Sequence, residues 1–128
     1  MLISQGIDLL NVKRINKVYK RYGQRFLDKV FSYNEVEIFK KRNKLNFLAN
    51  RFAAKEAILK AFGFGLRNGV KLTEIEILND HFGKPEVFLK GKTKQILYSS
   101  CNLKITKINI SISDEKEYVV ASALLILE

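Results

Sequence analysis

One predicted helical stretch, the run RFAAKEAILKAFGFG over 51–65, has charged residues at unusual positions. Lys55 falls inside the apolar stripe of the predicted helix, where an ion without a partner costs on the order of several kcal/mol. One explanation is an internal Glu56–Lys60 pair at i, i+4, which is worth only about 0.2–0.5 kcal/mol. The other is a charged site built on a rigid helix, beside the glycine-rich turn of Gly63 and Gly65.

Two carboxylates are candidates for holding a hard divalent cation. Asp8 lies on a predicted first strand, on the face opposite its apolar neighbours, and Glu56 lies in the middle of the charged helix. Magnesium is typically held by one or two carboxylates together with water and substrate phosphates. A basic chain suits this arrangement, because its lysines can bind the phosphate oxygens that the metal leaves free. The simpler interpretation of Asp8, a solvent-facing residue at a strand end, stays open.

Nucleophilic catalysis by a triad is not predicted. His81 falls in a hairpin turn, and Cys101 follows a short helix with no histidine near it in the sequence. The sequence has no Walker lysine motif and no Gly-x-Gly-x-x-Gly after a strand, and the Gly63–Gly65 pair alone is weak evidence for a phosphate loop.

The composition bounds the class of protein and its partners. With 128 residues, 47% of them hydrophobic, the chain is expected to form a single domain over 1–128. A net charge of +10 implies an anionic partner, which leaves nucleic acid, a membrane surface, a phosphate-rich ligand or an acidic protein. The single cysteine excludes an internal disulfide and favours a reducing compartment. With no signal-peptide pattern and an apolar end over 119–127 too short to span a bilayer, a cytoplasmic location is expected.

The expected elements place the long charged helix in the centre of an α+β fold. In chain order they are a strand over 2–10, a helix capped by Asn11, a helix from the capping-box pattern at 32–35 to about 41, a long helix from about 46, a hairpin of strands 73–78 and 86–89, a short helix over 93–100, and strands over 103–113 and 118–127. The strand over 73–78 is expected to have one wet face, and the last strand, apolar in both phases, is expected to be central. The fold is therefore predicted as a mainly antiparallel sheet packed around a long buried helix.

Several motifs resemble the holo-[acyl-carrier-protein] synthase family, the small phosphopantetheinyl transferases. The similarity runs through Gly6-Ile-Asp8, the block Arg51-Phe-Ala-Ala-Lys-Glu-Ala, then Gly83-Lys-Pro85 and the strand Ile110–Ser113, and so covers nearly the whole chain. It implies the α+β 4′-phosphopantetheinyl transferase fold and a homotrimer with each site shared between neighbouring subunits. It implies neither a nucleic-acid nor a membrane partner.

The resemblance also implies an activity in fatty acid biosynthesis. The enzyme would transfer the 4′-phosphopantetheine moiety from coenzyme A to a serine of apo acyl carrier protein and release 3′,5′-ADP. Asp8 and Glu56 would hold Mg²⁺ against the coenzyme A diphosphate, and Lys60 would reach a diphosphate oxygen or the leaving group. The coenzyme A-binding residues implied are Lys55, Lys60, Gly63, Gly65, Lys84, Pro85 and Ser111. A fixed, buried role for Lys55 is equally compatible with its place in the apolar stripe.

The early basic segment then acquires a candidate partner, because acyl carrier proteins are small and acidic. The docking residues implied are Arg14, Val18, Arg21, Arg25, Phe26 and Lys29. Attraction of this kind would raise the association rate and weaken with salt. The alternative is a generic solvated basic face.

One departure from the family pattern leaves the proton acceptor unassigned. The family usually has Ser-x-Ser-His at the end of the penultimate strand, whereas this chain has Ser111-Ile-Ser-Asp114. The catalytic candidates are Glu56, Lys60 and Asp114. Two alternatives remain at this point, a basic nucleic-acid-binding module and a family member made inactive by Asp114.

Overall fold

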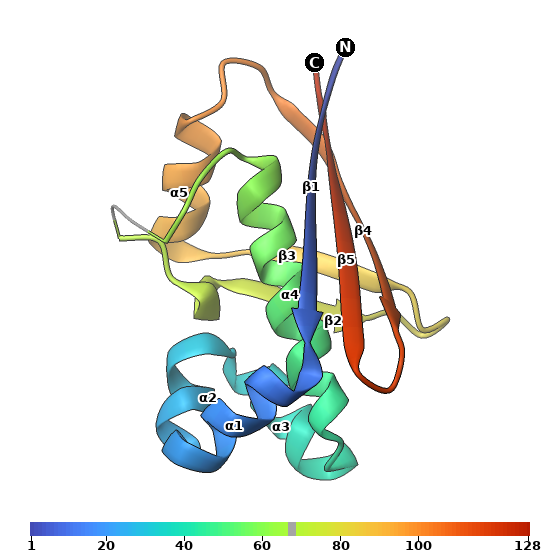
Figure 1. Cartoon of the computed structure of the whole chain (residues 1–128). Coiled ribbons are helices and arrows are strands. Elements are labelled where there is room, and N and C mark those ends of the chain that lie inside the picture. Colours follow the sequence, from blue (N-terminus) through green and yellow to red (C-terminus); the bar gives the residue numbers. More distant parts are fainter. Residues whose placement is uncertain (67–68) are drawn as a thin grey trace.

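A long helix packed across a three-stranded antiparallel sheet forms the centre of the molecule (Figure 1). The structure is a computed structural model and describes residues 1–66 and 69–128. Its elements are β1 (Leu2–Asn11), α1 (Val12–Tyr22), α2 (Gln24–Val30), α3 (Tyr33–Arg42), α4 (Leu45–Ala61), a 3-10 turn η1 (Leu72–Glu74), β2 (Ile75–Asn79), β3 (Pro85–Leu89), α5 (Gly91–Ser99), β4 (Ile105–Asp114) and β5 (Tyr118–Leu127). No described helix has the length and apolar character needed to cross a membrane.

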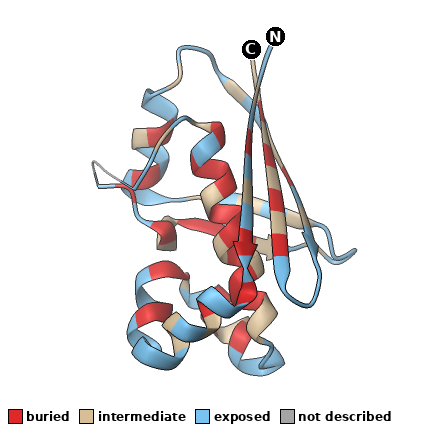
Figure 2. Cartoon of the chain, in the orientation of Figure 1, coloured by how far each residue is buried: buried red, intermediate tan, exposed pale blue. Residues whose placement is uncertain are grey.

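The central position of α4 follows from its small residues. Ala53, Ala54 and Ala57 are fully buried, so that neighbouring backbone approaches the helix closely on that side. Most of α4 is buried in Figure 2, between the sheet and the β2–β3 hairpin. The sheet order is β1-β5-β4, which confirms that the last strand is central, and the predicted α+β fold with antiparallel pairing is also confirmed.

Strand β1 turns its polar phase inward and its apolar phase outward. Asp8 belongs to the phase that faces α4, and its side chain is 15% exposed. Ile3, Ile7 and Leu9 lie on the other face of the sheet and are 57–69% exposed. The alternation is as expected, but an exposed apolar sheet face is unusual for a surface in contact with water.

Local signals at helix starts are confirmed. The Asn11 side chain accepts a hydrogen bond from the Lys13 backbone N–H at 2.9 Å, and Ser32 and Glu35 form a complete capping box.

Two expectations about elements are wrong. The sequence did not predict α2 as a separate helix. Gly23, with a φ of 54°, ends α1 and precedes the first residue of α2, which buries Phe26 and Leu27. The strand expected over 73–78 begins only at Ile75, and its supposedly wet face is dry at Glu76, which is 2% exposed.

Candidate active site

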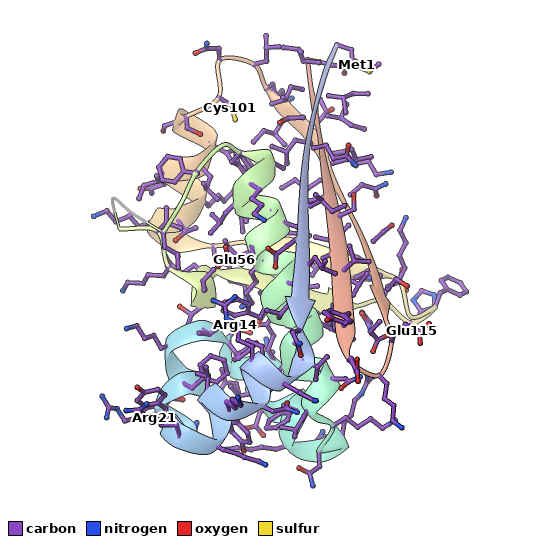
Figure 3. The ribbon with its side chains drawn as sticks, viewed as in Figure 1. Met1, Arg14, Arg21, Glu56, Cys101 and Glu115 are labelled. Carbon is purple, nitrogen blue, oxygen red and sulfur yellow. The ribbon has the colours of Figure 1, made fainter. Side chains whose placement is uncertain are left out.

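Glu56 of α4 lies where β1 packs across the helix (Figure 3), and Asp8 of β1 is near enough for its charge to act on the Glu56 carboxylate. Burial raises the pKa of Glu56, and the negative charge of nearby Asp8 raises it further, while Lys60 and Arg14 lower it. Lys60 Nζ donates to Asp8 Oδ1 at 2.9 Å and to the Ile7 carbonyl at 3.0 Å. We call Asp8, Glu56 and Lys60 the carboxylate cluster. It places two negative groups together with one half-exposed ammonium group.

Gly6 sets the spacing of the carboxylate cluster. A Cβ at this position would collide with the Ala57 carbonyl oxygen and the Ala61 backbone nitrogen. Ser4 Oγ donates to the Ala61 carbonyl at 2.5 Å, which holds the same stretch of β1 against α4. Because Asp8 lies two residues after Gly6 on the same face of the strand, the close strand–helix contact brings its carboxylate to α4.

The local Glu56–Lys60 pair considered from the sequence does not form. Lys60 pairs with Asp8, far away in the chain, and Glu56 has Lys60 only as a nearby charge. The charges of this stretch therefore belong to a tertiary site rather than to the helix alone.

Lys55 does not reach the carboxylate cluster, which corrects the expectation that it binds coenzyme A phosphate. Its side chain is fully buried, and Nζ donates to Glu35 Oε1 at 2.6 Å, to the Leu72 carbonyl at 2.8 Å and to the Val30 carbonyl at 2.9 Å. Burial lowers the pKa of Lys55, and the Glu35 carboxylate opposes that shift. An ammonium group has three donors, and all three are used.

A second group of predicted residues lines a cleft at the other edge of the sheet. This β4-edge cleft has a volume of about 360 Å³ and contains Lys84, Pro85, Ser111 and Asp114. The strand β5 separates it from β1, so that two strand spacings, roughly 10 Å, lie between its edge and that of Asp8. One chain therefore divides the predicted site residues between two edges of its sheet.

Arg51 is a residue of the β4-edge cleft that the sequence interpretation did not assign to a site. It is 5% exposed, its Nη2 donates to Asn79 Oδ1 at 3.2 Å, and its guanidinium lies 4.7 Å from the centre of the Phe47 ring. Burial lowers its pKa, and its buried Nε has no hydrogen-bond partner within the described ranges 1–66 and 69–128. A buried cation with a free donor in a cleft suits an anion. The signal in the sequence that could have indicated Arg51 is its place as the first residue of the motif Arg51-Phe-Ala-Ala-Lys-Glu-Ala.

Four of the predicted docking residues line a groove between α1 and α2. The α1–α2 groove, about 390 Å³, is formed by Val18, Tyr22, Arg25, Phe26 and Lys29. Tyr22 was not predicted. Arg14 and Arg21 lie outside the lining: Arg14 is near Glu56, and Arg21 lies over the Tyr22 ring, far from Glu56 (Figure 3).

The glycine turn follows directly on α4. Gly63 has a φ of 68°, which favours glycine, and a Cβ at Gly63 or Gly65 would meet no neighbouring atom. Residues 67–68 lie outside the described residues. The backbone at both glycines is thus open on one side.

Comparison with known proteins decides the family. A family model described as the 4′-phosphopantetheinyl transferase superfamily matches residues 4–123. The chain belongs to this superfamily. It is 40% identical to a holo-[acyl-carrier-protein] synthase of Wigglesworthia glossinidia brevipalpis, over 96% of this chain and 91% of that protein.

Solved structures agree on family and fold. An acyl carrier protein synthase of Plasmodium yoelii with ADP bound is 41% identical, with a TM-score of 0.84 over 100% of this chain and 97% of that chain. The synthase–CoA complex named from Chronobacterium ammoniagenes is 29% identical, with a TM-score of 0.86 over 100% of this chain and 99% of that chain. The family recognised from the motifs and its fold are both confirmed.

Proposed function

We propose that the protein is a holo-[acyl-carrier-protein] synthase, which transfers 4′-phosphopantetheine from coenzyme A to a serine of apo acyl carrier protein. The observation that carries this proposal is the carboxylate cluster, where Asp8 and Glu56 meet beside Lys60. The similar synthases, including structures with CoA or ADP bound, support the same activity.

Asp8 and Glu56 are the residues that would hold Mg²⁺. Among the described residues no three His, Cys, Asp or Glu side chains group together, but two carboxylates are enough for an ion that also takes water and substrate phosphates. The pKa of Glu56 is raised first by burial and then by the negative charge of Asp8, and a divalent cation would offset the repulsion between the two carboxylates. When bound, the ion supplies Lewis-acid polarisation of the diphosphate.

The chain's own residues then orient the reactants. The serine oxygen attacks the phosphorus that carries the pantetheine arm, and the bond from that phosphorus to the 3′,5′-ADP oxygen breaks. Lys60 is half-exposed and close enough to Asp8 to turn from it towards a diphosphate oxygen or the leaving group. The open space beside Gly63 and Gly65, which no side chain fills, would let a phosphate approach the backbone closely. The base that takes the serine proton is left unassigned.

A homotrimer with shared sites is the second part of the proposal. The exposed apolar face formed by Ile3, Ile7 and Leu9 continues onto their neighbours Ile126 and Val120 in β5, as an oligomer interface would require. With the carboxylate cluster on one edge and the β4-edge cleft on the other, a neighbouring subunit would complete each site. Lys84, Pro85, Ser111, Asp114 and Arg51 would then contact the nucleotide end of coenzyme A.

The α1–α2 groove is the proposed docking site for the carrier. Phe26 and Val18 offer apolar contact within a rim of Arg25 and Lys29. Arg14, nearer to Glu56, would meet the carrier close to its serine, and Arg21 would attract it from the rim. We further propose that residues 1–128 act as one domain in the cytoplasm, in fatty acid biosynthesis; the lone Cys101 suits a reducing compartment.

The test is the mass of the carrier after incubation with the enzyme, Mg²⁺ and coenzyme A. One added phosphopantetheine is expected, and an unmodified carrier would overturn the proposal. Asp114→His in the same assay addresses the inactive-member alternative: an active parent refutes that alternative, while an inactive parent rescued by histidine supports it.

A further inference from the structure

Lys55 is the centre of a buried polar network that the proposed chemistry does not use. Its three acceptors come from three different parts of the chain, namely the end of α2, the start of α3 and η1. Glu35 completes the network, because its Oε2 accepts the Ile77 backbone N–H at 2.9 Å and its Oε1 also accepts the Ser32 N–H at 2.9 Å. We call Lys55, Glu35 and the Val30 and Leu72 carbonyls the Lys55 node.

The Lys55 node is shielded from solvent, and each of its polar groups has a hydrogen-bond partner. Both side chains are fully buried. Hydrogen bonds to ionised groups are roughly twice as strong as neutral ones, and removing one partner leaves the other desolvated. A fully satisfied buried network of this kind fixes one arrangement of the elements that it joins.

One end of the node is the helix that lines the docking groove. Val30 is the last residue of α2, which contributes Arg25, Phe26 and Lys29 to the α1–α2 groove. A helix of 7 residues is not stable by itself, so its position depends on its anchors. The other end of the node is α4, where Lys55 directly precedes Glu56 of the carboxylate cluster.

We propose that Lys55 is a positioning residue for the carrier protein, which fixes α2 and its docking groove relative to Glu56. This inference rests on the proposed function, because it requires the α1–α2 groove to receive the carrier. The carrier must present its serine at the carboxylate cluster while docked, and misplacement by about 1 Å can lower a rate by about 10²-fold. Among the described residues, no side-chain hydrogen bond joins the node to those that would contact coenzyme A, although the charge of Glu35 acts on Arg51.

The test separates the two substrates in steady-state kinetics of the Lys55→Met/Glu35→Gln double variant. This pair removes both charges and leaves no buried ion unpaired. The KM for apo carrier protein is expected to rise at least about fivefold, with the KM for coenzyme A within about twofold of wild type, since only docking geometry changes. Amide hydrogen exchange over 24–30 is expected to accelerate. Glu35→Gln alone leaves the Lys55 ammonium buried without its carboxylate, so it is expected to give the same split together with a larger loss of stability than the double variant.

A matched control distinguishes positioning from general loss of stability. Leu125→Ala opens a cavity at a fully buried position of β5, whose register partners are Ser4 of β1 and Ile108 of β4. The two variants are compared under conditions where they have lost the same free energy of unfolding. Both KM values are expected to stay near wild type in this control. If the control gives the same split, or if the double variant raises the KM for coenzyme A as much as that for the carrier, the inference is wrong.

A docking variant separates this inference from the proposal on which it rests. Arg25→Ala is expected to raise the KM for the carrier. If it does and the double variant does not, only the role of Lys55 is overturned. If Arg25→Ala has no effect, the groove is not the docking site and the inference fails with it, while a wild type that leaves the carrier unmodified overturns the proposed function itself.

Discussion

Lys55 and Glu56 are neighbours on α4 and have opposite environments. Lys55 is sealed in the protein interior, with each of its donors matched to an acceptor. Glu56 is half-buried near a second carboxylate, and its pKa is raised by burial and by Asp8. The successive residues point in different directions from the helix, one towards α2 and α3, the other towards β1.

The difference shows how a structural charge and a site charge can be told apart. The Lys55 node is complete within the chain and needs nothing from outside. The carboxylate cluster keeps two like charges together, which costs stability in the free protein and is relieved by a cation. The residue that looks anomalous in the sequence, a lysine in an apolar stripe, is the structural one.

The largest effect expected is on catalysis at the carboxylate cluster. Asp8→Asn keeps the side-chain shape but removes a charge, so transfer to the carrier should fall by about 10²–10³-fold. The folded state should be retained, because Asp8 lies near the surface of the site. Rates at saturating substrates check this, with Glu117→Gln on the β4–β5 turn as a carboxylate control. If Asp8→Asn transfers at the wild-type rate, Asp8 does not take part in catalysis.

The complementary change at the Lys55 node should act on stability. Lys55→Met leaves Glu35 buried and unpaired, which costs about 3–5 kcal/mol when a buried pair loses one partner. Adding Glu35→Gln should restore much of the loss, since no ion then remains unpaired. Denaturant unfolding measures the free energy of unfolding of both variants. A double variant no more stable than Lys55→Met would show that the unpaired Glu35 charge does not cause the loss.

A change at the contact between β1 and α4 tests the geometry that joins the two carboxylates. Gly6→Ala introduces a methyl group against the Ala57 and Ala61 backbone, so the strand must move outward. Overpacking of this kind costs about 1–3 kcal/mol, and activity should fall more than stability alone explains, because Asp8 moves with the strand. Ala123→Gly, at the register partner of Gly6 in β5, is the control. It exchanges the same two residue types and so changes the conformational entropy of the unfolded chain by a similar amount, in the opposite direction. A fully active Gly6→Ala enzyme would contradict this role.

The smallest effect expected is a gain in stability on removing the Glu56 charge from the metal-free protein. The folded pKa of Glu56 lies above its ordinary value of 4.5, so the folded state binds this proton more tightly than the unfolded chain. The resulting penalty is complete above the folded pKa and disappears as the pH falls through it towards 4.5. Glu56→Gln should therefore melt higher than wild type at neutral pH in chelator, and the gain should shrink in acid. A variant that melts lower at both pH values would contradict the assignment.

The elements were predictable where local chemistry decides them. The Asn11 cap, the capping box at Ser32 and the β2–β3 hairpin follow from neighbouring residues, and the central strand follows from its two apolar phases. Helix α2 was missed because its buried residues are few and its basic residues continue the charge pattern of α1.

Tertiary partners explain the remaining errors. Glu76 reads as solvent-facing in the alternating strand, yet Lys90, Ser32 and Asn34 donate to it and keep it charged in a nearly buried place. Burial opposes this, but these hydrogen bonds prevail and lower its pKa. The partner of Lys55 lies on another helix, so no spacing rule could find Glu35. The pairing of Asp8 with Glu56 was likewise out of reach of spacing and came from the family resemblance.

The most direct test of the carboxylate cluster is the thermal stabilisation that coenzyme A and Mg²⁺ give together. Ligands that bind the folded state raise its melting temperature by mass action. Wild type should melt higher with coenzyme A and Mg²⁺ than with coenzyme A in chelator, and Glu56→Gln should lose that metal-dependent increment. The same increment in both proteins would show that the metal and the diphosphate do not meet at Glu56.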